Sequence, residues 1–209
     1  MNDSCCIEPD PNLTFVGSDS VQQLSFTGMF YFGVILCART PLSCSTLDLL
    51  LPLSQPCLRT VSRLQCVLRS SETEGIHTLH PLFHDYLSKR CDTEPWSINI
   101  ELHHEMLTRH CIKLLENTLQ ENICGLTLPY SVEEETLPKA VSYACKFWVE
   151  HICLISHATD NIRELVDRFL CQHLLHWMEA LSVLKSHSNT IQSLQIFLSG
   201  SRFVIQPSC

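Results

Sequence analysis

The stretch PCLRTVSRLQCVLRSSETEGIHTL, residues 56–79, decides the fold class. Pro56 stands where a helix can begin, because the first N–H groups of a helix need no intrahelical partner, and a short helix is expected at Cys57–Arg63. Two short extended runs follow, Gln65–Leu68 and Ile76–Leu79, and the polar stretch between them ends in Glu-Gly. Such runs around a glycine-containing loop are typical of a β-hairpin.

Two helices are predicted before this stretch. A hydrophobic helix is expected over Ser20–Ala38, ended by the Arg-Thr-Pro-Leu-Ser sequence that follows it. Ser45 and Thr46 are candidate caps for a short helix through Leu53. Three helices and then a hairpin are the order of elements in a winged helix.

The hairpin is expected to lead into another helix, because Pro81 suits a first helical turn and Leu82–Arg90 resumes a helical pattern. We therefore predict a winged-helix-like domain at 21–92 and an α-helical bundle or hairpin array at 93–199, flanked by tails at 1–20 and 200–209.

The second half has apolar residues at helical spacing throughout. Thr159 and Asp160 are expected to begin one helix, Cys171–Leu184 forms a further helical run, and a last helix is predicted near Thr190–Leu198. Aromatic residues at this spacing usually pack into a core. The residues expected on apolar helix faces are Leu107, Cys111, Leu114 and Leu115, then Val141, Cys145, Trp148 and Ile152, then Ile162, Leu165, Val166, Phe169 and Leu170, with Trp177 in the core.

The composition is that of a folded, mainly helical protein of the reduced cytoplasm. Hydrophobic residues make up 45% and charged residues 17%, with only six glycines among 209 residues. The thirteen cysteines are odd in number, most lie within apolar helical patterns, and the first twenty residues do not resemble a signal peptide, so the cysteines are expected to be free. The longest apolar run, Met29–Ala38, is well short of the ~20 residues of a membrane span.

No catalytic motif is complete in the sequence. No glycine is followed by lysine, so there is no phosphate-binding P-loop, and neither a Gly-x-Ser-x-Gly elbow nor a His-Glu-x-x-His zinc helix is found. We therefore expect a protein that is not an enzyme, with no cofactor, no catalytic residue and no small-molecule substrate of its own.

Several segments resemble one family in the order in which they occur. Leu79-His-Pro-Leu-Phe-His-Asp-Tyr-Leu87 resembles the histidine-containing segment that ends the winged helix of NACHT-type signal-transduction NTPases, particularly those of fungi. The segments VILCARTPLS at 34–43, YACKFWVEH at 143–151 and FLCQHLLHWMEALS at 169–182 resemble the flanking parts of the same proteins. The resemblance covers about residues 22–185 and includes neither the nucleotide-binding core nor downstream repeats.

The resemblance implies a regulatory role through other protein domains: the NTPase core, and repeat or effector regions. In that family the winged-helix histidine contacts the β-phosphate of ADP and holds the closed, inactive state, and here that role falls on His80. An imidazole N–H can donate to a phosphate oxygen, and a contact made in only one state biases a switch. The sequence departs from the family at Pro81, where plant receptors have aspartate, and at Leu82, where the fungal pattern has serine.

A basic face is expected around the third helix, formed by Arg59, Arg63 and Arg69. It would lie where a DNA-reading winged helix places its recognition helix, so a DNA-binding protein is the alternative function. The net charge of −8 disfavours nucleic acid, because neutralising phosphates supplies most of such affinity. The other interpretations are a solvated face and a surface that docks on an acidic partner domain.

A histidine-rich region raises a second alternative, a zinc-binding helical protein. Zinc needs three or four converging ligands, and the spacing here matches no known finger and contains no Cys-x-x-Cys pair. We therefore assign no metal ligand and keep the region as a candidate only. Its residues are His77, His80, His84, Cys91, His103, His104, His110 and Cys111.

Overall fold

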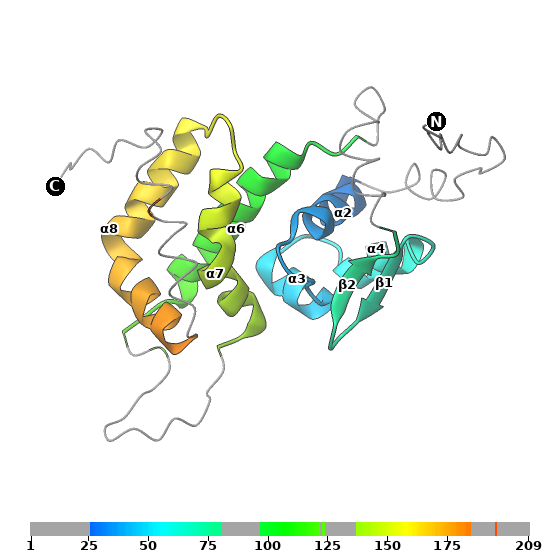
Figure 1. Ribbon diagram of the computed structural model, residues 1–209, viewed down its shortest axis with the longest axis horizontal. Helices are drawn as coiled ribbons and strands as arrows, with labels where there is room; N and C mark the ends of the chain where they lie inside the picture. The colour runs from blue at the N-terminus through cyan, green and yellow to red at the C-terminus, as the bar shows by residue number, and fades with distance from the viewer. Residues whose placement is uncertain (1–25, 81–96, 122, 124–136, 185–194, 196–209) are drawn as a thin grey trace, which may run out of the picture.

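The computed structural model of the protein describes residues 26–80, 97–121, 123, 137–184 and 195. The fold is mainly helical with one small hairpin after the early helices, which confirms the predicted fold class (Figure 1). The elements are α2 (Phe26–Cys37), α3 (Cys44–Leu50), α4 (Cys57–Arg63), β1 (Leu68–Ser71), β2 (Gly75–Thr78), α6 (Ile100–Thr118), α7 (Lys139–Cys153) and α8 (Asp160–Val183).

The first three helices pack on one another and carry the hairpin at their side (Figure 1). Helix α4 has the predicted bounds, but α3 differs from prediction at both ends. Its N-cap is Ser43, whose hydroxyl accepts the N–H of Thr46, so the buried Thr46 lies inside the first turn. The helix ends at Leu50, before Leu53, because Leu51 precedes a proline and has backbone angles of φ −122° and ψ 88°, outside the helical region.

Strands β1 and β2 pair antiparallel, with Leu68 opposite Thr78 and Ser71 opposite Gly75. The prediction of a strand from Gln65 was wrong, because the N–H groups of Val67 and Leu68 bond back to Leu64 C=O in a turn. Gly75 has φ of +84°, and a Cβ there would lie 2.7 Å from the carbonyl carbon of Pro41. Only glycine fits this close approach without strain.

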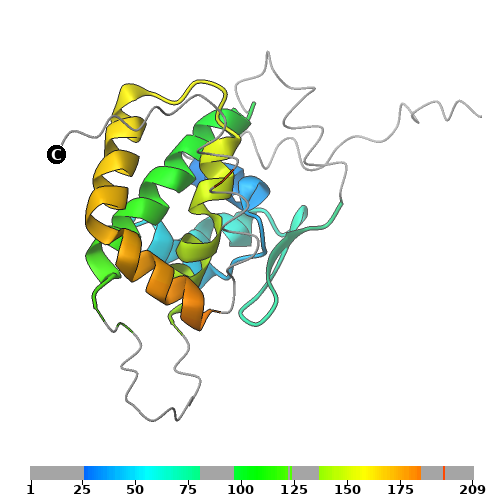
Figure 2. The ribbon, with the colours of Figure 1, turned by 60° about the vertical axis from the view of Figure 1, so that its left-hand side comes forward.

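Helices α6, α7 and α8 form the second part, in which α6 contacts both other helices (Figures 1 and 2). Its core contains Trp148, Phe169 and Trp177, all fully buried as predicted, with ring centroids of Trp148 and Trp177 5.2 Å apart. The indole N–H of Trp177 donates to Cys145 C=O at 2.9 Å. The run from Cys171 continues the helix that begins after Thr159, because no glycine or proline interrupts it.

The two parts pack directly on each other, with α2 against α6 and α3 against α7. Gly33 allows α2 to pack closely against α6, since a Cβ on this residue would lie 2.1 Å from Nε2 of His103. The ring of Phe30 packs beside those of His103 and His110 on α6.

Other predictions lie outside the described residues: the two tails, the helix at Leu82–Arg90, and the helix near Thr190–Leu198 except for Gln195. The predicted domain division therefore stays a prediction.

Candidate functional site

The most distinctive polar arrangement in the structure joins the two parts of the fold. The chain leaves α2 at Cys37, and the backbone N–H of Arg39 donates to Oη of Tyr143 on α7 at 3.2 Å. Tyr143 Oη lies 2.8 Å from Nε2 of His151 on the same helix. Nδ1 of His151 lies 3.0 Å from Nδ1 of His104 on α6. We call these four residues the interface network.

The three ring side chains of the interface network are almost completely removed from solvent, whereas the Arg39 side chain is partly exposed. Tyr143 is 3%, His151 0% and His104 6% exposed. Burial, and secondarily the proximity of His104 and Arg39, lowers the pKa of His151 to about 3, so this imidazole is neutral at physiological pH. Burial also raises the pKa of the Tyr143 hydroxyl well above its usual value, so the hydroxyl keeps its proton.

These protonation states determine which group donates and which accepts in each hydrogen bond of the network. A neutral imidazole has one donor and one acceptor nitrogen. Tyr143 Oη accepts from Arg39 N–H and donates its proton to Nε2 of His151, which leaves His151 Nδ1–H to donate to Nδ1 of His104. This tautomer assignment gives the Tyr143 O–H an acceptor and pairs the two facing Nδ1 atoms as donor and acceptor. The network therefore requires the end of α2, helix α7 and helix α6 to be in place together.

Two sets of more exposed contacts surround the network. Nε of Arg39 pairs with Oε2 of Glu150 at 2.6 Å, next to His151 in sequence. Both side chains are partly exposed, so this ion pair contributes little by itself. In the second set, the carboxylate of Glu101 in the first turn of α6 accepts the backbone N–H groups of Ser156 and His157. These bonds lower the pKa of Glu101. They fix the start of α6 to the segment between α7 and α8.

The interface network is suited to coupling the two parts of the fold rather than to catalysing a reaction. Its tyrosine and its two histidines bond to one another and are buried, and the thiols of Cys37 and Cys111 are poor nucleophiles. Burial raises the pKa of Cys37 to about 12, and burial also raises the pKa of Cys111. The network is suited to holding two parts of the protein in register.

The residues singled out from the sequence as site candidates are exposed. His80 follows Thr78 and Leu79 at the end of the hairpin. Arg59 and Arg63 lie one turn apart on the exposed side of α4, and Arg69 is exposed on β1, opposite His77. The two α4 arginines thus share a face, whereas His80 lies on a different element.

The histidine-rich region divides among separate structural roles. His103 packs on Gly33 and Phe30, and its Nδ1 lies 2.7 Å from Asn99 C=O. His104 belongs to the interface network, and Cys111 is buried in the helical core. Within the described ranges no three His, Cys, Asp or Glu side chains are grouped as metal ligands would be. His84 and Cys91 lie outside those ranges.

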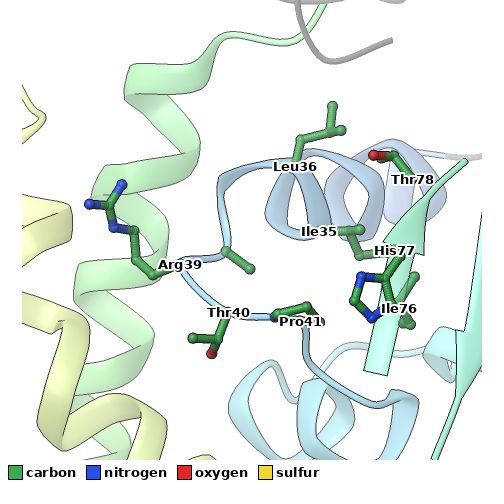
Figure 3. Close-up of a pocket in the computed structure, with 9 residues that line it drawn as sticks. Ile35, Leu36, Arg39, Thr40, Pro41, Ile76, His77 and Thr78 are labelled. Atoms are coloured by element: carbon green, nitrogen blue, oxygen red, sulfur yellow. The ribbon is translucent and has the colours of Figure 1, made fainter. Parts of the chain in front are cut away.

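A pocket lies between the end of α2 and β2 (Figure 3). Its volume is about 180 Å³, less than the ~300–1,000 Å³ of typical small-molecule sites. The guanidinium of Arg39 points away from Ile76 and His77, toward the long helices of the second part. The lining residues are Ile35, Leu36, Ala38, Arg39, Thr40, Pro41, Ile76, His77 and Thr78.

Sequence reasoning did not find the interface network. One signal was present, because His104 lies three residues before Leu107 and seven before Cys111, on an otherwise apolar stripe. A polar residue on such a stripe predicts a buried partner, but it does not identify the partner.

Comparison with known proteins gives no relative: no family model, no curated protein and no solved structure matches the chain. Among the described helices, none has the length and apolar character needed to cross a membrane.

Proposed function

We propose that this chain is a non-catalytic regulatory module that passes a change at its hairpin to its long helices. The observation that carries the proposal is the buried interface network, which joins the loop after α2 to both α6 and α7. Because buried polar groups are costly to leave without partners, displacement of Arg39 would disturb Tyr143 and His151 as well.

A continuous set of contacts connects His80 to this network. His80 follows β2, and β2 is attached to the loop between α2 and α3 by the Ile76 N–H, which donates to Leu42 C=O at 2.9 Å. The same loop contains Arg39, whose N–H reaches Tyr143. A displacement of His80 would therefore act, through β2 and the bond from Ile76 to Leu42, on the loop that is bonded to Tyr143 of α7.

The partner that the resemblance supports is an NTPase core of the NACHT type. His80 is exposed and would contact the nucleotide phosphate only in the docked state. Arg59 and Arg63, exposed on one side of α4, would face an acidic part of the same partner. The identity of the partner comes from the resemblance. The exposure of His80, Arg59 and Arg63 leaves these residues available to contact it.

The test is a binding titration of the full chain against the isolated NTPase core of a fungal NACHT protein, loaded with ADP or with a non-hydrolysable ATP analogue. We expect tighter binding to the ADP-loaded core, and we expect His80→Ala to reduce that preference. His77→Ala, an exposed histidine on β2, is the matched control and should keep the preference. Equal affinity for both loaded forms, or equal effects of the two alanine variants, would contradict the proposed sensing role.

A further inference from the structure

Two buried cysteine thiols meet where helices α3 and α4 begin. Cys44 is the first residue of α3 and Cys57 is the first residue of α4, and the two helices pack on each other. Cys44 is 8% exposed and Cys57 is 0% exposed, and both are free thiols. The S–H group of Cys57 donates a hydrogen bond to the sulfur of Cys44. We call these two residues the α3–α4 thiol pair.

The position of the thiol pair is fixed by contacts of Asp48, which lies one turn after Cys44 on α3. Its Oδ1 accepts the backbone N–H of Cys57 at 2.8 Å and the hydroxyl of Tyr31 on α2 at 2.7 Å. The carboxylate of Asp48 therefore holds the start of α4 beside α3, with α2 as a third partner. Because the bond to Asp48 places the backbone of Cys57, the closeness of the two sulfurs follows from the packing of the helices.

The two thiols differ in access and in the hydrogen bond between them. Burial raises the pKa of both thiols, and the carboxylates of Glu72 and Asp48 raise it further. The bond from Cys57 stabilises the thiolate of Cys44, which is also the more exposed of the two. The thiolate is the attacking species in disulfide exchange. Cys44 is therefore the attacking residue and Cys57 the resolving one, with slower attack than at an exposed cysteine such as Cys66.

We propose that the α3–α4 thiol pair is a reversible redox site that low-molecular-weight disulfides of the glutathione type oxidise to a disulfide. The Cys44 thiolate attacks one sulfur of the small disulfide, which breaks the S–S bond and releases one thiol after proton uptake. Cys57 loses its proton and attacks the Cys44 sulfur, which releases the second thiol. The two cysteines lose two electrons and two protons together, and the small disulfide is reduced to two thiols. This site is independent of the proposed regulatory function.

The disulfide would join the starts of α3 and α4 and close residues 44–57 into a loop. The native packing already holds the two sulfurs in contact, whereas the unfolded chain brings them together only rarely. Oxidation is therefore expected to favour the folded state, and folding is expected to favour oxidation by the same factor.

The oxidised fraction of one tryptic peptide tests the proposal. Trypsin cleaves after Arg39 and Arg59, and the peptide 40–59 contains Cys44 and Cys57 and no other cysteine. The full chain is equilibrated with mixtures of glutathione and its disulfide, quenched with acid, alkylated and digested. The disulfide form of this peptide lacks two hydrogen atoms and carries no alkyl group, so mass spectrometry separates it from the dithiol form.

We expect the ratio of disulfide to dithiol to be roughly tenfold higher in the native chain than in the chain unfolded in urea, at the same ratio of glutathione to its disulfide. Cys57→Ser should stop at a glutathione adduct on Cys44, because the resolving thiol is missing. Cys66→Ser, at an exposed cysteine before β1, is the matched control and should leave the ratio unchanged.

Two results, both measured on the wild type, would overturn this proposal. One is a ratio in the native chain that is equal to or lower than the ratio in the unfolded chain. The other is a glutathione adduct that persists on Cys44 of the native chain while Cys57 remains a thiol, which would show that Cys57 does not resolve it.

Discussion

Replacing His151 by glutamine should remove a measurable part of the pH dependence of stability. His151 lies between Tyr143 of its own helix and His104 of α6, and the charge of Arg39 also acts on it. Its pKa is lowered to about 3 in the folded protein, whereas a histidine in an unfolded chain titrates near ~6.5. Below pH ~6.5 the His151 imidazole is therefore protonated in the unfolded state but not in the folded state. The free energy of unfolding consequently falls as the pH falls.

The size of the effect follows from the two pKa values. Between them the free energy of unfolding changes by ~1.4 kcal/mol per pH unit for one such group. From pH 7 to pH 5 the contribution of His151 integrates to about 2 kcal/mol. Below pH 3 the folded protein also binds the proton, and the slope from this group ends.

The assay is urea denaturation of the wild type and of His151→Gln at several pH values between 5 and 7. The difference between the two proteins isolates His151, because carboxylates and the other histidines titrate in both. The wild type should lose about 2 kcal/mol more than the variant between pH 7 and pH 5. His157→Gln, at an exposed histidine just after α7, should follow the wild-type profile. Parallel profiles for the wild type and His151→Gln would refute the neutral, buried histidine on which the network depends.

Three further predictions concern the interface and the exposed arginines. Tyr143→Phe removes the hydroxyl that serves both Arg39 N–H and His151 Nε2, and should lower the free energy of unfolding by about 1–3 kcal/mol in urea titrations; an unchanged midpoint would show that the bonds do not form. Gly33→Leu should cost about 1–3 kcal/mol in the same titrations, since the added side chain meets the ring of His103, and full stability would contradict the close packing of α2 on α6. In gel shifts with duplex DNA we expect no salt-sensitive binding, and a shift abolished by Arg59→Glu with Arg63→Glu would favour the DNA-binding alternative.

Local rules were sufficient for much of the fold. Helix α4 begins after Pro56 as predicted, and the apolar spacing placed Trp148, Phe169 and Trp177 in the core. The errors lay at element boundaries, where local backbone hydrogen bonds compete with the predicted helix or strand. The segment before Leu68 forms a turn on Leu64 C=O, because those backbone bonds are local, whereas strand pairing starts only where β2 lies opposite.

The interface network could not be predicted because its bonds join distant parts of the chain. Arg39 and Tyr143 are 104 residues apart, and His104 and His151 are 47 apart. Composition and periodicity describe each helix by itself, and they do not say which polar residue on one stripe meets which on another. The exposed positions of His80, Arg59 and Arg63 agree with a docking role, but such a role depends on a partner whose identity comes from the resemblance.

The central claim is that the two parts of the chain are held as one unit through the interface network. The most direct measurement is hydrogen exchange of the full chain in increasing urea, with peptides from 26–80 and from 100–183 followed separately. We predict one shared unfolding midpoint for both sets in the wild type, and separate midpoints in Tyr143→Phe. Distinct midpoints in the wild type, with residues 26–80 opening while α6 and α7 stay protected, would contradict the account.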